Sequence, residues 1–171
     1  LAERNIELKA FQSDEAKDEV LDSLSQYMGE KYPHISKVYN RIKRTLNSAR
    51  GFRIDLKQDT QEVISYSTQF CSLLHKYALL SDYRYFNSPK YLLTGKSARI
   101  PMGINFLTGQ WLERFVKSTL LQEAQRCRPD LPFAYLMNPQ IVLPNGDDFE
   151  LDLLVYLDGA IYWFEAKTGQ Y

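Results

Sequence analysis

An Asp158-Gly159 dipeptide between two apolar, strand-like runs is the feature that most constrains the fold of this chain. Asp-Gly joins β-strands through a two-residue turn, because both central positions of that turn need positive φ angles. The dipeptide therefore predicts a hairpin of residues 149–156 and 160–167, in which Leu157 pairs with Ala160. A turn of fixed length also fixes the register of both strands, and thus which side chains share a face.

This register places Asp152 directly opposite Glu165, and Glu150 opposite Lys167. Directly paired residues have Cβ atoms about 4.5–5.5 Å apart. Two carboxylates at that spacing repel each other unless one is protonated or a cation lies between them. Oxygen-rich sites of this kind suit Mg²⁺ or Mn²⁺, and the ammonium group of Lys167 can orient a water or stabilise developing negative charge. We therefore expect a metal site on this hairpin.

A purely structural interpretation of the same residues stays open. Glu150 and Lys167 can form an ordinary cross-strand ion pair, with Asp152 solvated at the edge of the sheet. The expected faces also matter: Glu150, Asp152, Leu154 and Tyr156 should share one face, and Phe149, Leu151, Leu153 and Val155 the other. The metal site is favoured because the turn fixes Asp152 at the cross-strand position.

Glu113 is the third acidic candidate. It lies on a predicted helix from Gly109 to about Arg126, at the edge of an apolar stripe that includes Val116 and Leu120. An acid at this position should lie near the sheet rather than in open solvent. The alternative is a first-turn glutamate that interacts with the helix N-terminus.

Glu113 on a helix, Asp152 on a strand and Glu165-Ala166-Lys167 on the next strand together resemble the PD-(D/E)XK superfamily of restriction-endonuclease-like phosphodiesterases. The resemblance implies a divalent metal, Mg²⁺ or Mn²⁺, held by Asp152 and Glu165, with the Ala166 backbone carbonyl as a further ligand. It also implies that Lys167 is the catalytic lysine, which assists the nucleophilic water, and that Glu113 is an auxiliary acid. Nucleic acid, DNA or RNA, would be the substrate.

The stretch from Phe106 to Glu113, with its Gly-Gln-Trp-Leu-Glu entry to the helix, narrows this resemblance. Together with Glu-Leu-Asp at 150–152 and Glu-Ala-Lys-Thr at 165–168, it is similar to the nuclease domain of CRISPR-associated nucleases activated by cyclic oligoadenylate. The resemblance implies a role in antiviral defence, and dimers are common in the superfamily. The superfamily core continues after Glu-x-Lys, so we expect a core that is truncated at the C-terminus, within a piece of a longer protein.

The residues before the predicted nuclease core suggest a separate segment. We expect helices over about 13–32, 33–51 and 61–80, with Pro33 breaking the first from the second, then an aromatic hairpin over 82–95 and a linker over 95–103. Helices followed by a hairpin are compatible with a winged helix. The predicted fold class is thus α/β (α+β): a helical, winged-helix-like segment over 1–100, then a restriction-endonuclease-like core with a mixed β-sheet over 101–171.

Charge is distributed in blocks, although Lys+Arg and Asp+Glu both total 21 and the net charge is zero. Residues 31–57 carry eight bases against Asp55 alone, with Tyr32, Tyr39 and Phe52 between them. This block can track a phosphate backbone, or it can be a solvated helix face. The candidate nucleic-acid-binding residues are Lys37, Arg41, Lys43, Arg44, Arg50 and Arg53.

Composition adds few exclusions. No apolar run approaches the ~20 residues that span a bilayer, so a membrane partner is not expected. Two cysteines without CxxC spacing argue against a disulfide scaffold or zinc ribbon, and favour a cytoplasmic location. Two alternatives to a nuclease stay open: a regulatory or nucleic-acid-binding module without activity, and a degenerate nuclease fold that serves as a protein scaffold.

Overall fold

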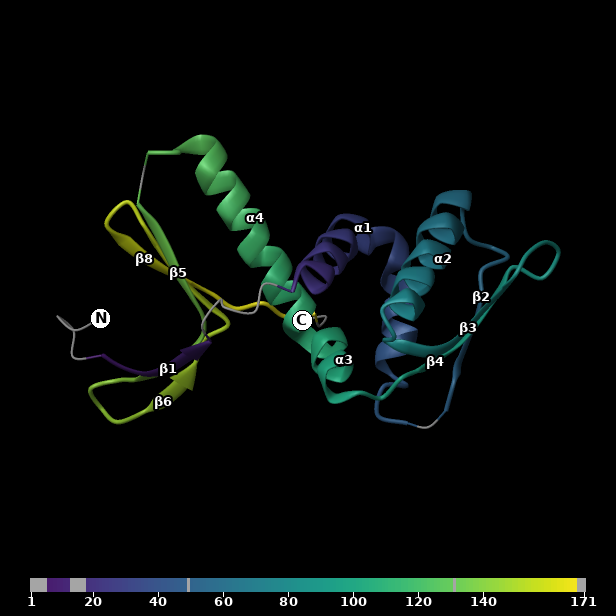
Figure 1. The fold of residues 1–171 in the computed structure, drawn as a ribbon, viewed down its shortest axis with the longest axis horizontal. Helices are drawn as coiled ribbons and strands as arrows, with labels where there is room; N and C mark the ends of the chain where they lie inside the picture. The colour runs from purple at the N-terminus through teal and green to yellow at the C-terminus, as the bar shows by residue number, and fades with distance from the viewer. Residues whose placement is uncertain (1–5, 13–17, 49, 131, 169–171) are drawn as a thin grey trace. The chain divides into compact units, whose positions relative to one another are not determined.

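A computed structural model describes residues 6–12, 18–48, 50–130 and 132–168 of the chain (Figure 1). Its internal contacts divide it into two compact units. The helical unit is Ser23–Trp111, and the sheet unit combines Leu1–Asp22 with Leu112–Tyr171. Helices and antiparallel sheets occur together in the chain, which confirms the predicted α+β class.

The helical unit contains two long helices and a small sheet with the strand order β2-β4-β3, antiparallel throughout. Thr60 caps the second long helix by accepting a hydrogen bond from the Val63 N–H at 3.3 Å. The aromatic hairpin is also confirmed. The elements are α1 (Glu19–Lys43, which begins in the sheet unit), β2 (Phe52–Asp55), α2 (Gln61–Lys76), β3 (Leu80–Phe86), β4 (Leu92–Ser97), α3 (Pro101–Asn105) and a π-helical turn (Phe106–Gln110).

Pro33 does not break the first helix, contrary to expectation, because α1 continues through it to Lys43. A proline inside a helix costs about 3 kcal/mol, since it removes one hydrogen bond and crowds the preceding turn. Here the proline is exposed, while one continuous apolar stripe on α1 is buried on both sides of it. Burial of this stripe outweighs the local cost. The stripe consists of Leu21, Leu24, Met28, Ile35, Val38 and Ile42.

Three further boundaries differ from those expected. The helical stretch ends before Gly51, and β2 follows it with alternating buried and exposed residues, a period-two pattern that the sequence carries. The predicted linker over 95–103 is largely structured, since β4 extends to Ser97 and α3 begins at Pro101. The helix expected from Ser13 begins at Glu19 in the structure, and residues 13–17 lie outside the described part.

The sheet unit has the strand order β1-β5-β7-β8, with β6 also paired to β5. Every strand pair in the described residues is antiparallel, whereas a mixed sheet was expected. A parallel pair needs a crossover connection, and short turns join β5 to β6 and β7 to β8 instead. The elements are β1 (Glu7–Gln12), α4 (Trp111–Cys127), β5 (Phe133–Val142), β6 (Asp148–Glu150), β7 (Leu153–Leu157) and β8 (Ala160–Phe164).

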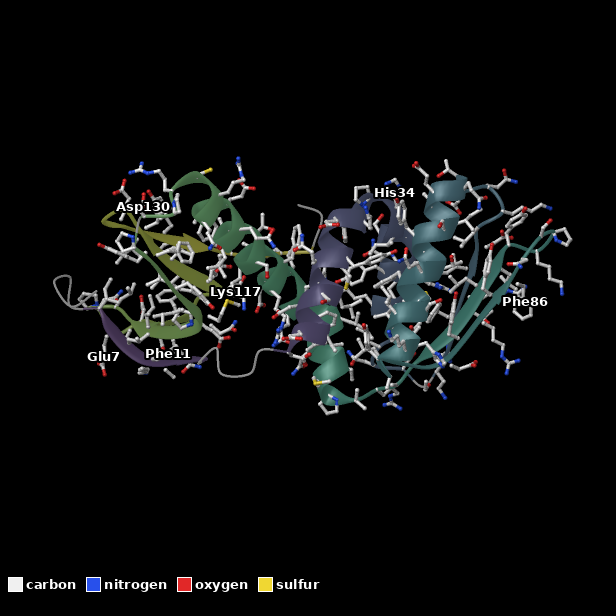
Figure 2. All side chains as sticks on the ribbon, turned by 45° about the horizontal axis from the view of Figure 1, so that its top comes forward. Glu7, Phe11, His34, Phe86, Lys117 and Asp130 are labelled. Atoms are coloured by element: carbon white, nitrogen blue, oxygen red, sulfur yellow. The ribbon has the colours of Figure 1, made fainter. Side chains whose placement is uncertain are left out.

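The helix expected over 109–126 is confirmed as α4, which runs along one face of this sheet (Figure 1). Its side chains Val116 and Leu120 pack against a buried cluster of Met137, Leu153 and Val155. Lys117, labelled on α4 in Figure 2, lies with its Nζ 5.8 Å from the centre of the Tyr135 ring on β5. The helix therefore brings the residues of its first turn close to the strands.

None of the helices in the described part of the chain combines the length and the apolar character needed to span a membrane.

Candidate active site

The predicted register of the hairpin is confirmed. Five residue pairs join β7 to β8, from Leu157 opposite Ala160 to Leu153 opposite Phe164. Asp158 and Gly159 have φ angles of 51° and 77°, which is the backbone that the two-residue turn requires. The ladder stops at Leu153 and Phe164, so Asp152 and Glu165 lie immediately beyond its last pair.

The strand expected over 149–156 is interrupted at Leu151 and Asp152, where β6 ends and β7 has not begun. On the partner strand, Asn138 has a φ of 47° and Pro139 follows it. Two backbone hydrogen bonds of 3.1 Å bridge the interruption: the Asn138 N–H donates to the Asp152 carbonyl, and the Leu151 N–H to the Pro139 carbonyl. The irregularity is therefore shared by both strands, because Pro139 has no N–H for a regular ladder.

This irregularity corrects two of the expected placements. Leu151 packs with Ile141 and Leu154, not on the face of Leu153 and Val155, because the interruption breaks the alternation of side chains. The β6 register places Glu150 opposite Gln140 on β5, and the β7–β8 ladder ends at Leu153 and Phe164. The regular hairpin ladder therefore does not extend to the expected pairing of Glu150 with Lys167.

Asp152 is tied to the Glu-Ala-Lys segment by a short hydrogen bond. Its Oδ2 accepts from the Ala166 N–H at 2.6 Å, and the bond is partly buried. Hydrogen bonds from N–H groups to carboxylates are stronger than those between neutral groups and fix the orientation of the acid. The structure therefore joins Asp152 to the middle residue of the motif through the backbone, and Glu165 and Lys167 lie on either side of that contact.

Glu165 and Lys167 form an ion pair, with 3.1 Å between Oε2 and Nζ, and both side chains are roughly half exposed. The spacing of two residues places them on the same side of an extended segment. The segment leaves the regular sheet after Phe164, which shortens the strand expected over 160–167. The lysine charge that the sequence predicts beside the acidic residues is therefore present, and it sits directly on Glu165.

Glu113, in the first turn of α4, is half-buried and accepts a hydrogen bond from Asn138 Nδ2 at 3.3 Å. Burial raises the pKa of its carboxyl above the usual range, and the negative charges of Asp152 and Glu150 raise it further. The Asn138 hydrogen bond and the Arg114 charge act against this rise. The carboxyl thus lies toward the sheet and within electrostatic reach of Asp152.

The arrangement offers oxygen donors of the kind that Mg²⁺ and Mn²⁺ prefer, carboxylates on adjacent segments. In the described part of the chain, no group of three or more His, Cys, Asp or Glu side chains is placed so as to hold a metal ion. Asp152 and Glu165, with the Ala166 carbonyl, fit the chemistry of such an ion as a small donor set that water molecules can complete.

Asn138 is the site residue that sequence reasoning missed. It contacts Glu113 through its side chain and Asp152 through its backbone, so it connects the helix to the interrupted strand. The signal was available in part, because an Asn-Pro dipeptide marks irregular backbone and asparagine tolerates positive φ. Its contact with Glu113 depends on the packing of α4 and could not be inferred.

The six basic candidates are only partly brought together. Lys37, Arg41, Arg44 and Arg53 line one surface hollow of the helical unit, whereas Lys43 and Arg50 are not among its lining residues. The Nζ of Lys43 instead lies 5.9 Å from the centre of the Tyr39 ring. The basic hollow, defined by its lining residues Lys37, Asn40, Arg41, Arg44, Arg53, Ile54 and Asp55, is therefore narrower than the predicted set.

No protein-family model matches the chain, and no curated protein matches it. Among solved structures, its fold is similar to that of Can2 from Sulfobacillus thermosulfidooxidans, determined in complex with cyclic tetra-adenylate (cA4), with a TM-score of 0.52 and 16% sequence identity. The similarity covers 91% of this chain and 38% of the Can2 chain, so this chain spans less than half the length of that protein. At this level of identity the similarity shows a shared fold.

Proposed function

We propose that this chain is the nuclease part of a defence protein and hydrolyses phosphodiester bonds of DNA or RNA with the help of Mg²⁺ or Mn²⁺. The observation that carries the proposal is the 2.6 Å hydrogen bond from the Ala166 N–H to Asp152, which joins the acid of one strand to the Glu-Ala-Lys segment of the next. A structural ion pair between strands does not need this contact. The resemblance of these residues to the PD-(D/E)XK superfamily supports the same function.

In this proposal Asp152 and Glu165 hold the metal, together with the Ala166 carbonyl. The metal supplies a positive charge that stabilises the pentavalent phosphorus of the transition state. Lys167 orients the attacking water and holds negative charge beside it. Glu113 acts as an auxiliary acid beside Asp152, and burial raises the pKa of its carboxyl above the usual glutamate range.

The biological setting in the proposal rests on two independent similarities. The Gly-Gln-Trp-Leu-Glu segment and the Glu-Ala-Lys motif resemble CRISPR-associated nucleases that respond to cyclic oligoadenylate. The solved structure with a similar fold contains cyclic tetra-adenylate, which is such a molecule. We therefore place the chain in antiviral defence by analogy with these proteins. The two cysteines without CxxC spacing favour the cytoplasm, and the resemblance to the PD-(D/E)XK superfamily, where dimers are common, favours a homodimer.

The test is cleavage of plasmid DNA, single-stranded DNA and single-stranded RNA by the intact chain and by Asp152→Asn, with Mg²⁺ or Mn²⁺ and with EDTA. The expected result is cleavage that is lost with EDTA and with the substitution. Asp158→Asn is the matched control, because it removes a carboxylate from the turn of the same hairpin and asparagine suits its φ of 51°. This control should cleave like the original chain.

Mn²⁺ binding, followed by electron paramagnetic resonance, gives a second measurement that does not depend on turnover. Binding should weaken in Asp152→Asn and persist in Asp158→Asn. Cleavage that resists EDTA, or metal binding unchanged by Asp152→Asn, would overturn the proposal.

A second candidate function, a nucleic-acid-binding module without activity, is favoured by the basic hollow alone. It predicts salt-sensitive binding that survives Asp152→Asn, without metal binding and without cleavage by the folded chain.

A further inference from the structure

The end of α1 and the turn that follows it present one basic stripe to the surface. Asn40, Arg41 and Arg44 lie three, four and seven residues after Lys37, which places them on one side of a helix. Arg44 is one residue beyond the end of α1, and its N–H donates to the Asn40 carbonyl at 3.2 Å as in a helix. The opposite side is fully buried and includes Ile35, Val38 and Ile42. The stripe is thus fixed by the packing of the helix, because the helix cannot rotate without exposing its apolar side.

Strand β2 completes the hollow beside this stripe. Arg53 and Asp55 are both exposed and lie two residues apart, so they project to the same side of the strand. With Ile54 and the α1 stripe they line a hollow of about 450 Å³. All of these residues belong to the helical unit, so the hollow is separate from the acidic residues around Asp152.

The positive charge in this hollow exceeds the negative charge of its carboxylates, since four basic side chains line it beside Asp55 alone. Lys37 is engaged, since its Nζ donates to the Asp55 carbonyl at 3.1 Å and pairs with Asp59. The Asp55 carboxylate accepts from the Lys57 N–H at 2.8 Å. Within the described residues, the guanidinium groups of Arg41, Arg44 and Arg53 take part in no ion pair or hydrogen bond.

Three other arginines of the described residues behave differently. Arg84, Arg114 and Arg126 each have a carboxylate within 4.0 Å. Three guanidinium groups that converge on one hollow without an acidic partner repel one another, and a polyanion relieves this repulsion. The dipole of α1 by itself stabilises positive charges such as Arg41 and Arg44 near the C-terminal end of the helix. That effect does not account for Arg53 on β2.

We propose that the basic hollow binds the sugar–phosphate backbone of a nucleic-acid strand. Guanidinium groups donate two parallel hydrogen bonds to phosphate oxygens, which suits repeated phosphates. The lining contains no aromatic side chain on which a base could stack, so recognition is of the backbone and independent of sequence. The inference rests on the proposed function and deepens it, since it names residues of the helical unit that hold the substrate strand.

The experiment measures binding of two fluorescent single-stranded DNA 20-mers of unrelated sequence to the full chain carrying Asp152→Asn, in EDTA, over a series of salt concentrations. In this background Arg41→Gln, Arg44→Gln and Arg53→Gln are each compared with Arg84→Gln. Arg84 is the matched control because it is an exposed arginine of the same unit outside the hollow. Each variant removes one positive charge.

Each of the three hollow variants should weaken binding of both oligonucleotides several-fold and reduce the slope of log K against log salt by about 0.7 per lost contact. Arg84→Gln should leave both quantities close to the background value. Equal weakening by Arg84→Gln, or unchanged slopes in all three hollow variants, would overturn the assignment. Competition by inorganic phosphate at the same total phosphate concentration would show a site for free phosphate and also contradict it.

This outcome is distinct from that of the proposed function. Binding is measured without metal and in a variant without the Asp152 carboxylate, so a failure of cleavage does not affect it. A chain that cleaves but whose binding ignores Arg41, Arg44 and Arg53 would keep the proposed function and lose this inference.

Discussion

The two units of the chain differ in how they bury their apolar residues. In the helical unit, side chains from both long helices are completely buried, among them Met28, Ile35, Phe70 and Leu74. In the sheet unit the described clusters are small and rely on half-buried neighbours, with Leu153 as the best-buried member at 1% exposure. The candidate active site thus belongs to the unit whose described core clusters are smaller.

The outer strand of the sheet unit shows the same difference in burial between the two units. Ile161, Tyr162 and Trp163 on β8 are all at least 49% exposed. The helical unit instead buries two of its large aromatic residues almost completely, since Trp111 and Tyr39 are at most 2% exposed. Since apolar burial is the main favourable term in folding, we expect the helical unit to hold most of the stability of the chain.

The largest expected effect follows from this difference in burial. Phe70→Ala should lower the free energy of unfolding of the helical unit by about 3–5 kcal/mol, because it leaves a cavity in a fully buried core. Leu153→Ala should cost about 2–3 kcal/mol in the sheet unit, near the lower end for such changes, since its neighbours are half-buried and can relax.

The two tryptophans allow each unit to be followed alone. Trp111 reports on the helical unit and Trp163 on the sheet unit, so urea unfolding is measured by fluorescence in Trp163→Phe and Trp111→Phe backgrounds. Phe70→Ala should shift the Trp111 transition most, and Leu153→Ala the Trp163 transition. Identical shifts of both transitions by both substitutions would mean that the chain unfolds as one cooperative unit, and the contrast would be broken.

A smaller effect is expected from a polar contact inside the helical unit. The Tyr39 hydroxyl donates to the Leu107 carbonyl and accepts from Trp111 Nε1, both at 3.0 Å and both buried. Tyr39→Phe should cost about 1–3 kcal/mol, because it leaves two buried polar groups without partners. Tyr32→Phe is the control, since its ring also contacts Trp111 but its hydroxyl makes no hydrogen bond in the described residues. Thermal unfolding that is equal in the two variants would contradict this assignment.

The sequence predicted those parts of the fold that short-range rules determine. The hairpin register follows from Asp158-Gly159 and from the alternation of its strands, and the start of α2 follows from Thr60. The strand β1 was missed, although Ile6, Leu8 and Ala10 alternate with Glu7 and Lys9 at its start. Its described side chains are all exposed, so this alternation does not mark a buried face. Its position comes from backbone hydrogen bonds to β5, a partner about 130 residues away in sequence.

The site shows the same division. Asp152, Glu165 and Lys167 belong to one hairpin, so their proximity could be derived from the turn. The interruption at Asp152 could not, because it is set by Asn138 and Pro139 on the neighbouring strand. The continuity of α1 through Pro33 likewise depends on burial of its stripe by other elements, which overrides a local propensity. The strand register is thus determined by residues that are close in the sequence. The backbone irregularities that shape the site depend instead on tertiary contacts.

The smallest expected effect concerns Glu113. Its substitution should raise the stability of the sheet unit and so reduce the difference in stability between the two units. Because its pKa in the folded chain is raised above the usual glutamate value, the folded state holds this proton more tightly than the unfolded state. Its contribution to stability is therefore fully present below the usual glutamate pKa and is lost as pH rises through the raised value. Glu113→Gln should remove this loss, so that the sheet unit is more stable than the original at neutral pH.

Urea unfolding of the sheet unit between pH 4 and 8 measures this prediction, with Trp163 as the probe. Asn138→Ala should have the opposite effect. It removes the hydrogen bond that lowers the pKa of Glu113, so this pKa should rise further and stability should fall more steeply as pH increases. Parallel pH profiles for Glu113→Gln and the original chain would contradict the assignment. If Glu113→Gln is more stable but cleaves more slowly, the Glu113 carboxyl lowers the stability of the fold and promotes the reaction. This is the trade-off between stability and activity expected for an active-site group.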